Sequence, residues 1–335
     1  MSSNKKIEDG LEHIRNAEKS LKTSLLKWRP DYENAADEYN KAATCFRNAK
    51  SFDQCRDCLL KAVECHKQNR ALFYAAKALD QCVLMSKELG DLRAIPQYAE
   101  RAANMYHTQG NAESAASALD KAAKIIEQKL PADALKLYQH ATEIVMIQDS
   151  TRQAAEYASK IARLHVKLMQ YDLAADAIRR ELGLHQQNES YQATGRLTVA
   201  LVLVQLARGD VVAAEKAFKE WGNYCEAPEL QTLESLLQAY DEEDPEGAKR
   251  ALNSPFIKHM DVEYAILARD MRLPESSLPQ TRVVQENPSA PIDVVSKAQG
   301  DEELEVFSND EQPSSATEEV PTEENEEDEY AGGLC

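Results

Sequence analysis

The feature that most constrains the fold of this chain is a stripe of apolar and small residues that returns about every 20 residues. Within each copy the stripe occupies offsets 0, 3, 7, 10 and 14, which lie on one side of an α-helix. The first copy is Tyr32, Ala35, Tyr39, Ala42 and Phe46, and further copies begin at Phe52, Leu72, Leu92, Ala112, Pro131, Thr151, Tyr171 and Val211. From Tyr32 to Tyr171 the copies start 20, 20, 20, 20, 19, 20 and 20 residues apart, so the pattern predicts a regular series of helices.

Two helices of this spacing form a unit of about 40 residues, longer than the roughly 34-residue tetratricopeptide unit. Small Ala residues alternate with large Tyr or Phe residues in the stripe, which lets each large side chain enter a gap on a neighbouring helix. The first 270 residues contain only 8 Gly and 6 Pro, and no segment alternates with the period of two that is typical of a half-buried strand. We therefore expect an all-α solenoid of antiparallel, tetratricopeptide-like helix pairs.

Other helix boundaries follow from the same kind of pattern. An earlier helix is expected over Ile7–Leu25, and later helices are expected to begin near Tyr191, Leu230 and Pro245. Three glycines are each followed by Asp or Asn, at Gly90, Gly110 and Gly209. A left-handed glycine followed by a side-chain N-cap is a typical boundary between two helices.

Charge is concentrated in the C-terminal part of the chain. From Met271 to Cys335 there are 17 acidic and 3 basic residues, so this segment carries −14 of the net charge of −18. Its composition, rich in Pro, Ser and Glu, is typical of disorder. We expect three regions: a helical body over residues 1–270, a disordered linker over 271–321 and an acidic tail over 322–335. Such a tail disfavours nucleic acid as a partner and favours basic protein surfaces.

Cysteine usage and hydropathy indicate the compartment. The seven cysteines are odd in number and the chain is long, which favours a reducing environment over a secreted disulfide framework. The N-terminus lacks an apolar signal region. The longest apolar stretch, Leu197 to Ala207, has 11 residues, whereas a membrane span needs about 20. We expect a cytoplasmic protein in which this stretch is a buried helix.

No catalytic or cofactor motif stands out in the sequence. Phosphate-binding loops, dinucleotide fingerprints, nucleophile elbows, zinc-protease helices and calcium loops are not found. Cys55 and Cys58, followed by Cys65 and His66, invite a zinc or redox interpretation. On a helix, however, these positions follow the packing stripe, so we interpret the thiols as packed. The sequence predicts neither enzymatic activity nor a cofactor or metal.

The segment between the first two expected helices brings apolar and basic residues together. Leu25, Leu26 and Trp28 lie beside Lys27 and Arg29. Burying one such apolar side chain contributes about 1.5–3 kcal/mol, and each nearby basic residue adds about 1 kcal/mol on anionic lipid. The pattern favours weak contact with a membrane surface. The alternative is that Trp28 folds back and covers the end of the helix hairpin.

Basic residues recur at equivalent positions of alternate helices. Offsets 9 and 12 are basic in the helix that begins at Ala112 and in the helix that begins at Thr151, and offset 9 is basic in the helix that begins at Tyr32. The residues are Lys41, Lys121, Lys124, Lys160 and Arg163, with Lys167 nearby. Alternate helices of a solenoid share one layer, so the sequence predicts a docking surface for an acidic partner. An ordinary solvated face is the alternative.

The last residues combine acidic and apolar character. A run that includes Glu326, Glu327, Asp328 and Glu329 is followed by Tyr330, by small residues and by Leu334. Most acidic tails only improve solubility. Here a short hinge presents one apolar side chain beside the acidic run, which suggests an electrostatic contact with an apolar tip.

Three motifs together carry a family resemblance: G-L-E-H-x-x-x-A-E-K from Gly10 to Lys19, L-K-W-x-P-D-Y from Leu26 to Tyr32, and D-E-Y-x-G-G-L-C from Asp328 to Cys335. With them the chain resembles soluble NSF attachment proteins, most closely the gamma type, over nearly its whole length. The resemblance implies a right-handed superhelical solenoid that ends in a small helical bundle.

It also implies a function and roles for the residues above. Members of the family are adaptors that bind assembled SNARE complexes and recruit and stimulate the hexameric ATPase NSF, which disassembles those complexes in vesicular traffic, including ER–Golgi transport. The membrane contact would be Leu25, Leu26 and Trp28, and the SNARE-binding face would have Lys160 as its best-placed residue. The acidic end and Leu334 would engage NSF. We expect a monomer when free, peripherally associated with membranes.

A second class of function uses the same solenoid. A tetratricopeptide-like scaffold could clamp short acidic peptide segments in another complex. Such a clamp would gather its basic residues in one groove of a few repeats. Because the basic positions extend over several units, the sequence favours a long, rod-like partner.

Overall fold

The computed structural model describes residues 3–23 and 28–275, and within them it contains fifteen α-helices, two 3₁₀ turns and no strand. The helices are α1 (Ser3–Leu21), α2 (Tyr32–Asn48), α3 (Phe52–Gln68), α4 (Leu72–Glu88), α5 (Ile95–Thr108), α6 (Ala112–Ile126), α7 (Pro131–Ile147), α8 (Thr151–Lys167), α9 (Tyr171–Gln187), α10 (Thr194–Arg208), α11 (Val211–Trp221), α12 (Ala227–Asp241), α13 (Pro245–Leu252), α14 (Pro255–Lys258) and α15 (Val262–Arg269). The 3₁₀ turns are η1 (Leu92–Ala94) and η2 (Gly222–Tyr224).

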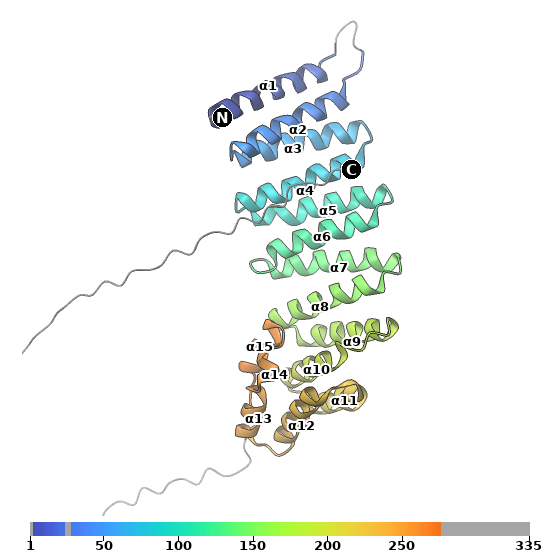
Figure 1. Cartoon of the computed structure of the whole chain (residues 1–335), viewed down its shortest axis with the longest axis vertical. Helices are drawn as coiled ribbons and strands as arrows, with labels where there is room; N and C mark the ends of the chain where they lie inside the picture. Colours follow the sequence, from blue (N-terminus) through green and yellow to red (C-terminus); the bar gives the residue numbers. More distant parts are fainter. Residues whose placement is uncertain (1–2, 24–27, 276–335) are drawn as a thin grey trace, which may run out of the picture. The chain divides into compact units, whose positions relative to one another are not determined.

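Consecutive helices pack against one another in chain order from α1 to α11 (Figure 1). Helices that are two apart also meet, since α4 contacts α6 and α5 contacts α7. The helices therefore form two layers, with even-numbered helices in one and odd-numbered helices in the other. The predicted all-α solenoid of helix pairs is confirmed.

Small residues allow this close stacking. The alanines of the stripe are almost entirely buried, among them Ala35, Ala42 and Ala75, which have no exposed surface. The large side chains of the same stripe, such as Phe46 and Tyr138, fill the remaining space and are also fully buried. Burial of apolar surface, worth about 25 cal/mol per Å², is thus distributed along the whole stack.

Most helix starts fall where the repeat predicts them, but four predicted boundaries differ from the structure. The helix expected from Leu92 begins at Ile95, after the 3₁₀ turn η1, because Pro96 suits the first turn of an α-helix. The first helix ends at Leu21 and not at Leu25, and its end is tightened by a hydrogen bond from Lys22 N to Lys19 O. The helices expected near Tyr191 and Leu230 begin three residues away, at Thr194 and Ala227.

The turns between helices use positive φ more widely than the glycines indicate. Gly90, Gly110 and Gly209 have φ of 74°, 73° and 85°, as expected. Non-glycine residues such as Lys50 and Arg70 also adopt φ near 60°. There the next residue's N–H closes the helix, as in the bond of 2.9 Å from Ser51 N to Phe46 O, which offsets the strain.

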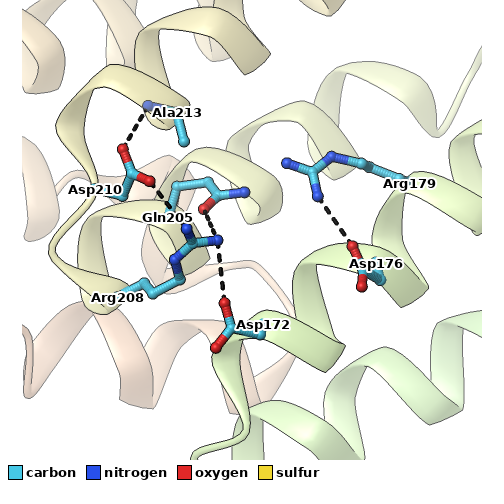
Figure 2. Close-up of polar contacts among 7 residues, drawn as sticks. All are labelled: Asp172, Asp176, Arg179, Gln205, Arg208, Asp210 and Ala213. Atoms are coloured by element: carbon cyan, nitrogen blue, oxygen red, sulfur yellow. Dashed lines mark hydrogen bonds and ion pairs between the residues drawn. The ribbon is translucent and has the colours of Figure 1, made fainter.

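Beyond the repeats, α10 is buried along nearly its whole length, as predicted for the apolar stretch. Figure 2 shows how its end is attached: Arg208 binds Asp172 of α9 at 3.2 Å and Asp210 at 3.0 Å. Asp210 in turn caps α11 by accepting from Ala213 N at 2.8 Å. One guanidinium thus connects three successive helices at the point where the regular repeat ends.

The last helices pack back onto the repeats. Helix α12 contacts α10, α11, α13 and α14, and α15 contacts both α8 and α10 (Figure 1). Helix α15 therefore lies against a helix about 100 residues earlier in the sequence. This contact brings the C-terminal helices beside the layer that carries the basic residues.

Candidate functional site

Lys160 is the most enclosed of the six basic residues that the sequence pattern singles out. Its side chain, 20% exposed, leaves α8 and reaches α6, where its Nζ lies 2.6 Å from Asp120 Oδ1. The same ammonium lies 5.0 Å from the ring centre of Tyr138 and 5.5 Å from that of Tyr157, within cation–π distance. Lys160 therefore joins two neighbouring helices of the even layer and does not project freely into solvent.

Asp120 holds two lysines at once. Its Oδ1 accepts from Lys160, and its Oδ2 lies 2.7 Å from Nζ of Lys124, one turn further along α6. This contact raises the pKa of Lys124, chiefly through the hydrogen bond to Asp120. The carboxylate, whose side chain is only 15% exposed, fixes the direction of both ammonium groups.

The other lysines of this layer are more open to solvent. Lys121 is exposed on α6, and the side chain of Lys124 is 55% exposed despite its ion pair. Lys167, at the end of α8, is exposed and donates to the carbonyl of Glu127 at 3.3 Å and to Gln128 Oε1 at 3.0 Å. Lysines from α6 and α8 thus reach solvent along the same pair of helices.

Arg163 occupies a different position. Its Nη1 lies 3.4 Å from Asp261 Oδ1, at the start of α15, and its side chain is 30% exposed. One helix turn after Lys160, α8 is therefore tied to the C-terminal helices. We refer to Lys121, Lys124, Lys160, Arg163 and Lys167 together as the basic face.

Lys41 is separate from this group along the stack. It lies on α2, its side chain is 58% exposed, and its Nζ lies 2.7 Å from Glu38. That hydrogen bond raises the pKa of Lys41. It shares its position in the repeat with Lys121 and Lys160, but it lies two helix pairs before α6.

The structure adds residues that the sequence pattern missed. Lys77 is exposed on α4, and both Lys77 and Lys121 favour the charged form of Asp80, whose pKa is nevertheless raised because it is buried. Arg152 is exposed on α8 beside Lys160 and Arg163 in one hollow. Neither occupies a recurring basic offset, so only the folded contacts identify them.

Carboxylates recur beside these cations. Asp80 and Asp120 are equivalent residues of α4 and α6, 40 positions apart, and each faces a lysine of the next even helix. Asp80 also accepts from the hydroxyl of Tyr106 at 2.8 Å. The layer therefore carries an alternation of inner carboxylates and outer lysines, and its outward-facing charge is positive along α6 and α8.

The membrane-contact prediction and the NSF-contact prediction fall largely outside the described residues. Leu25 and Leu26 lie there, as do Glu326, Glu327, Asp328, Glu329 and Leu334. Trp28 is described: it precedes α2 and is 87% exposed. These assignments stay predictions.

The cysteines that invited a metal interpretation pack in the interior. Cys55, Cys58 and Cys82 are each at most 2% exposed, and burial raises the pKa of Cys58 and of Cys82 to about 12. Thiols with such a pKa stay protonated at neutral pH and make poor nucleophiles and ligands. Across residues 3–23 and 28–275, no three His, Cys, Asp or Glu side chains are grouped so as to hold a metal ion.

None of the helices described is both long and apolar enough to cross a membrane.

Stacked helix pairs that present charged side chains along one layer define a class of protein: a helical-repeat scaffold that binds other proteins.

Comparison with known proteins identifies the family within this class. Residues 8–254 match the model of the family described as soluble NSF attachment protein, SNAP. The chain belongs to this family. It is 26% identical over 284 residues to the gamma-soluble NSF attachment protein of Dictyostelium discoideum, covering 84% of this chain and 87% of the relative.

Two plant relatives agree. The gamma-soluble NSF attachment protein of Arabidopsis thaliana is 24% identical over 261 residues, covering 77% of this chain and 90% of the relative. The alpha-soluble NSF attachment protein of Vitis vinifera is 28% identical over 246 residues, covering 71% and 84%. The gamma-type resemblance is confirmed, and membership implies the role of an NSF attachment adaptor in membrane traffic.

Proposed function

We propose that this chain binds assembled SNARE complexes through its basic face and recruits and stimulates the NSF ATPase, which then disassembles them. The chain contributes position and charge and does not itself catalyse a reaction. The observation that carries the proposal is the family match, which spans α1 to α13 and includes both helices of the basic face.

The geometry supports a long acidic partner. Lys121, Lys124 and Lys167 reach solvent along α6 and α8, while Lys160 is held between them by Asp120. Exposed lysines spread over two repeats suit a rod of helices that carries acidic side chains. They suit a short peptide less well, because a peptide clamp concentrates its contacts in one groove.

A charge-reversal experiment tests the basic face. We expect Lys121→Glu with Lys124→Glu to weaken binding to a purified SNARE complex about tenfold or more, because two attractive contacts become repulsive. Binding of the unchanged chain should also fall as salt rises from 50 to 300 mM, since exposed charges are screened. Pull-down or calorimetric titration measures both effects.

Lys136→Glu provides a control for reversal of one charge outside the basic face. Lys136 is 74% exposed on α7, in the odd layer, and pairs only locally with Asp133 in the described structure. The same charge reversal there should leave the affinity unchanged. Equal losses for the double variant and for Lys136→Glu, or binding that ignores salt, would remove the basic face from the proposal.

The remaining contacts are proposed from the sequence. Glu326, Glu327, Asp328, Glu329 and Leu334 engage NSF, and Leu25, Leu26 and Trp28 make a weak contact with the membrane surface. The chain is cytoplasmic, monomeric when free and peripherally attached to membranes. A reconstituted disassembly assay with and without the chain tests the adaptor role as a whole.

A further inference from the structure

Helix α15 packs on α8 and α10, and the side that faces them is buried. Tyr264 is 2% exposed, and Leu267 and Ala268 are also buried. The outer side of the same helix leaves Val262 66% and Ile266 45% exposed. The helix is only eight residues long, so most of its stability comes from its packing on α8, α10 and α14.

The polar part of the interface is incompletely satisfied. Arg163 Nε, Glu181 Oε2 and the hydroxyl of Tyr264 are buried and have no hydrogen-bond partner. Burial is the main cause of the raised pKa of Tyr264, and the charge of nearby Glu181 raises it further. Unpaired buried polar atoms oppose burial, so the packing of α15 on α8 is weaker than its apolar contacts alone would make it.

A hollow of about 750 Å³ opens on the basic face, beside the contact between α8 and α15. Its walls come from α8 and from the second half of α9 and its following turn. Its basic residues are Arg152, Lys160, Arg163 and His185, and its acidic residues are Glu156 and Glu181. Glu181 is 4% exposed, and burial raises its pKa.

Two carboxylates from outside the hollow already form ion pairs with two of its basic side chains. Asp120 of α6 holds Lys160 at 2.6 Å, and Asp261 of α15 holds Arg163 at 3.4 Å. The second contact is long, and the carboxylate is 53% exposed, so an incoming anion can reach Arg163 from solvent. Each aspartate presents a carboxylate to a basic side chain, and an acidic side chain of a partner would present the same group.

We propose that the hollow between α8 and α9 is a subsite for carboxylate side chains of a protein partner, and that Asp261 is its resident competing ligand. A partner carboxylate that binds Arg163 displaces Asp261 and so weakens the packing of α15 on α8. Binding at the basic face and docking of α15 are then linked, and each opposes the other. The identity of the acidic partner as a SNARE complex rests on the proposed function, but the subsite itself does not.

The test compares Asp261→Asn with Asp270→Asn in the full-length chain. Asp261 makes no side-chain cap bond to α15, so its replacement by Asn leaves the helix start intact. Asp270 lies at the other end of the same helix and pairs with the adjacent Arg269 at 2.7 Å. The two variants therefore make the same charge change on one helix, but only the first releases Arg163.

Two ligands separate the subsite from the proposed function: a purified SNARE complex and polyglutamate as a plain carboxylate probe. We expect Asp261→Asn to tighten binding of both ligands about threefold, as expected for removal of a partly exposed competing ion pair. Asp270→Asn should bind like the unchanged chain. In the unchanged chain, either ligand should speed amide hydrogen exchange in Val262–Arg269.

The outcomes are distinguishable. Tighter polyglutamate binding without any SNARE binding would support the subsite and reject the proposed partner. Equal affinities for both variants with correct circular dichroism, or unchanged exchange in α15 on binding, would overturn the subsite. Failure of both ligands to bind at any salt concentration would overturn it as well.

Discussion

At the scale of single residues, two glycines inside helices have opposite surroundings. Gly10 on α1 faces Phe46, whose ring atoms would lie 3.0–3.2 Å from an added Cβ. Gly183 on α9 has no atom within 4 Å of that position. Phe46 is fully buried and has little freedom to move, so Gly10 is a packing requirement, and Gly183 is not. This contact also explains physically why a glycine opens the N-terminal motif.

We expect the same substitution to have opposite effects at these two positions. Gly10→Ala should destabilise the docking of α1 by about 1–3 kcal/mol through overpacking. Gly183→Ala should stabilise the chain by about 0.5–1 kcal/mol, because Ala loses less backbone entropy in a helix. Urea unfolding followed by circular dichroism measures both. If the two variants shifted the midpoint in the same direction, the close contact between Gly10 and Phe46 would be wrong.

Glu181 is a buried carboxyl group whose ionisation depends on the fold. Its raised pKa is caused first by burial, which outweighs the opposing effects of His185, Ser159 and Arg163. Because the folded-state pKa lies above the ordinary 4.5, the stabilising contribution of the protonated form is complete below pH 4.5. That contribution is lost as the pH rises through the folded-state value.

Glu181→Gln should therefore stabilise the protein at pH 8 and have a smaller effect at pH 5. A gain on the order of 1 kcal/mol is expected from removing a buried, incompletely paired charge, which corresponds to a rise in Tm of about 2–4 °C. Thermal unfolding across this pH range measures the difference. Glu156→Gln, at an exposed position of the same hollow, is the control for the loss of one negative charge. A gain that grew toward acid pH would contradict the assigned sign.

At the scale of helices, Asp120 offers a comparison between a contact within one helix and a contact between two. Lys124→Gln removes an exposed pair inside α6 and should cost about 0.5 kcal/mol or less. Lys160→Gln removes the bridge from α8 to α6 together with two cation–π contacts and should cost about 1–2 kcal/mol. Unfolding midpoints of the two variants measure the difference. Equal losses would mean that Lys160 does not join the two helices.

The helices themselves were largely predictable because their signal is local. The stripe with a period of 3.6 residues gave the starts of α2, α3, α4, α6 and α7 at the observed residues. The pairing of Lys160 with Asp120 was not predictable, since the sequence pattern identifies a shared layer but not which side chains meet across 40 residues. The structure adds that Lys160 bridges to Asp120 of α6, and its assignment to the SNARE-binding face stays a prediction. The contact of α15 with α8, about 100 residues away, left no periodic signal either.

At the scale of the whole molecule, charge is divided between two parts of the chain. Residues 271–335 carry −14 of the total −18, so the helical body is nearly neutral, with a local excess of lysines on its even layer. An acidic segment and a basic face call for partners of opposite sign. The division therefore suits an adaptor that binds two different proteins at once, and it predicts that the two activities can be separated by mutation.

Leu334→Ala tests that separation at the end farthest in sequence from the basic face. We expect the variant to keep its thermal stability and its affinity for the SNARE complex, because Leu334 belongs to neither the repeats nor the basic face. Its stimulation of NSF ATPase activity should fall to the unstimulated rate, since one buried apolar side chain contributes about 1.5–3 kcal/mol, or about ten- to a hundredfold in affinity. ATPase assays at several adaptor concentrations distinguish weaker recruitment from lost stimulation. The variant Lys121→Glu with Lys124→Glu should show the reverse: impaired SNARE binding with normal stimulation when the adaptor is immobilised at high density. Full stimulation by Leu334→Ala would show that the apolar tip is dispensable and that acidic charge alone engages the ATPase.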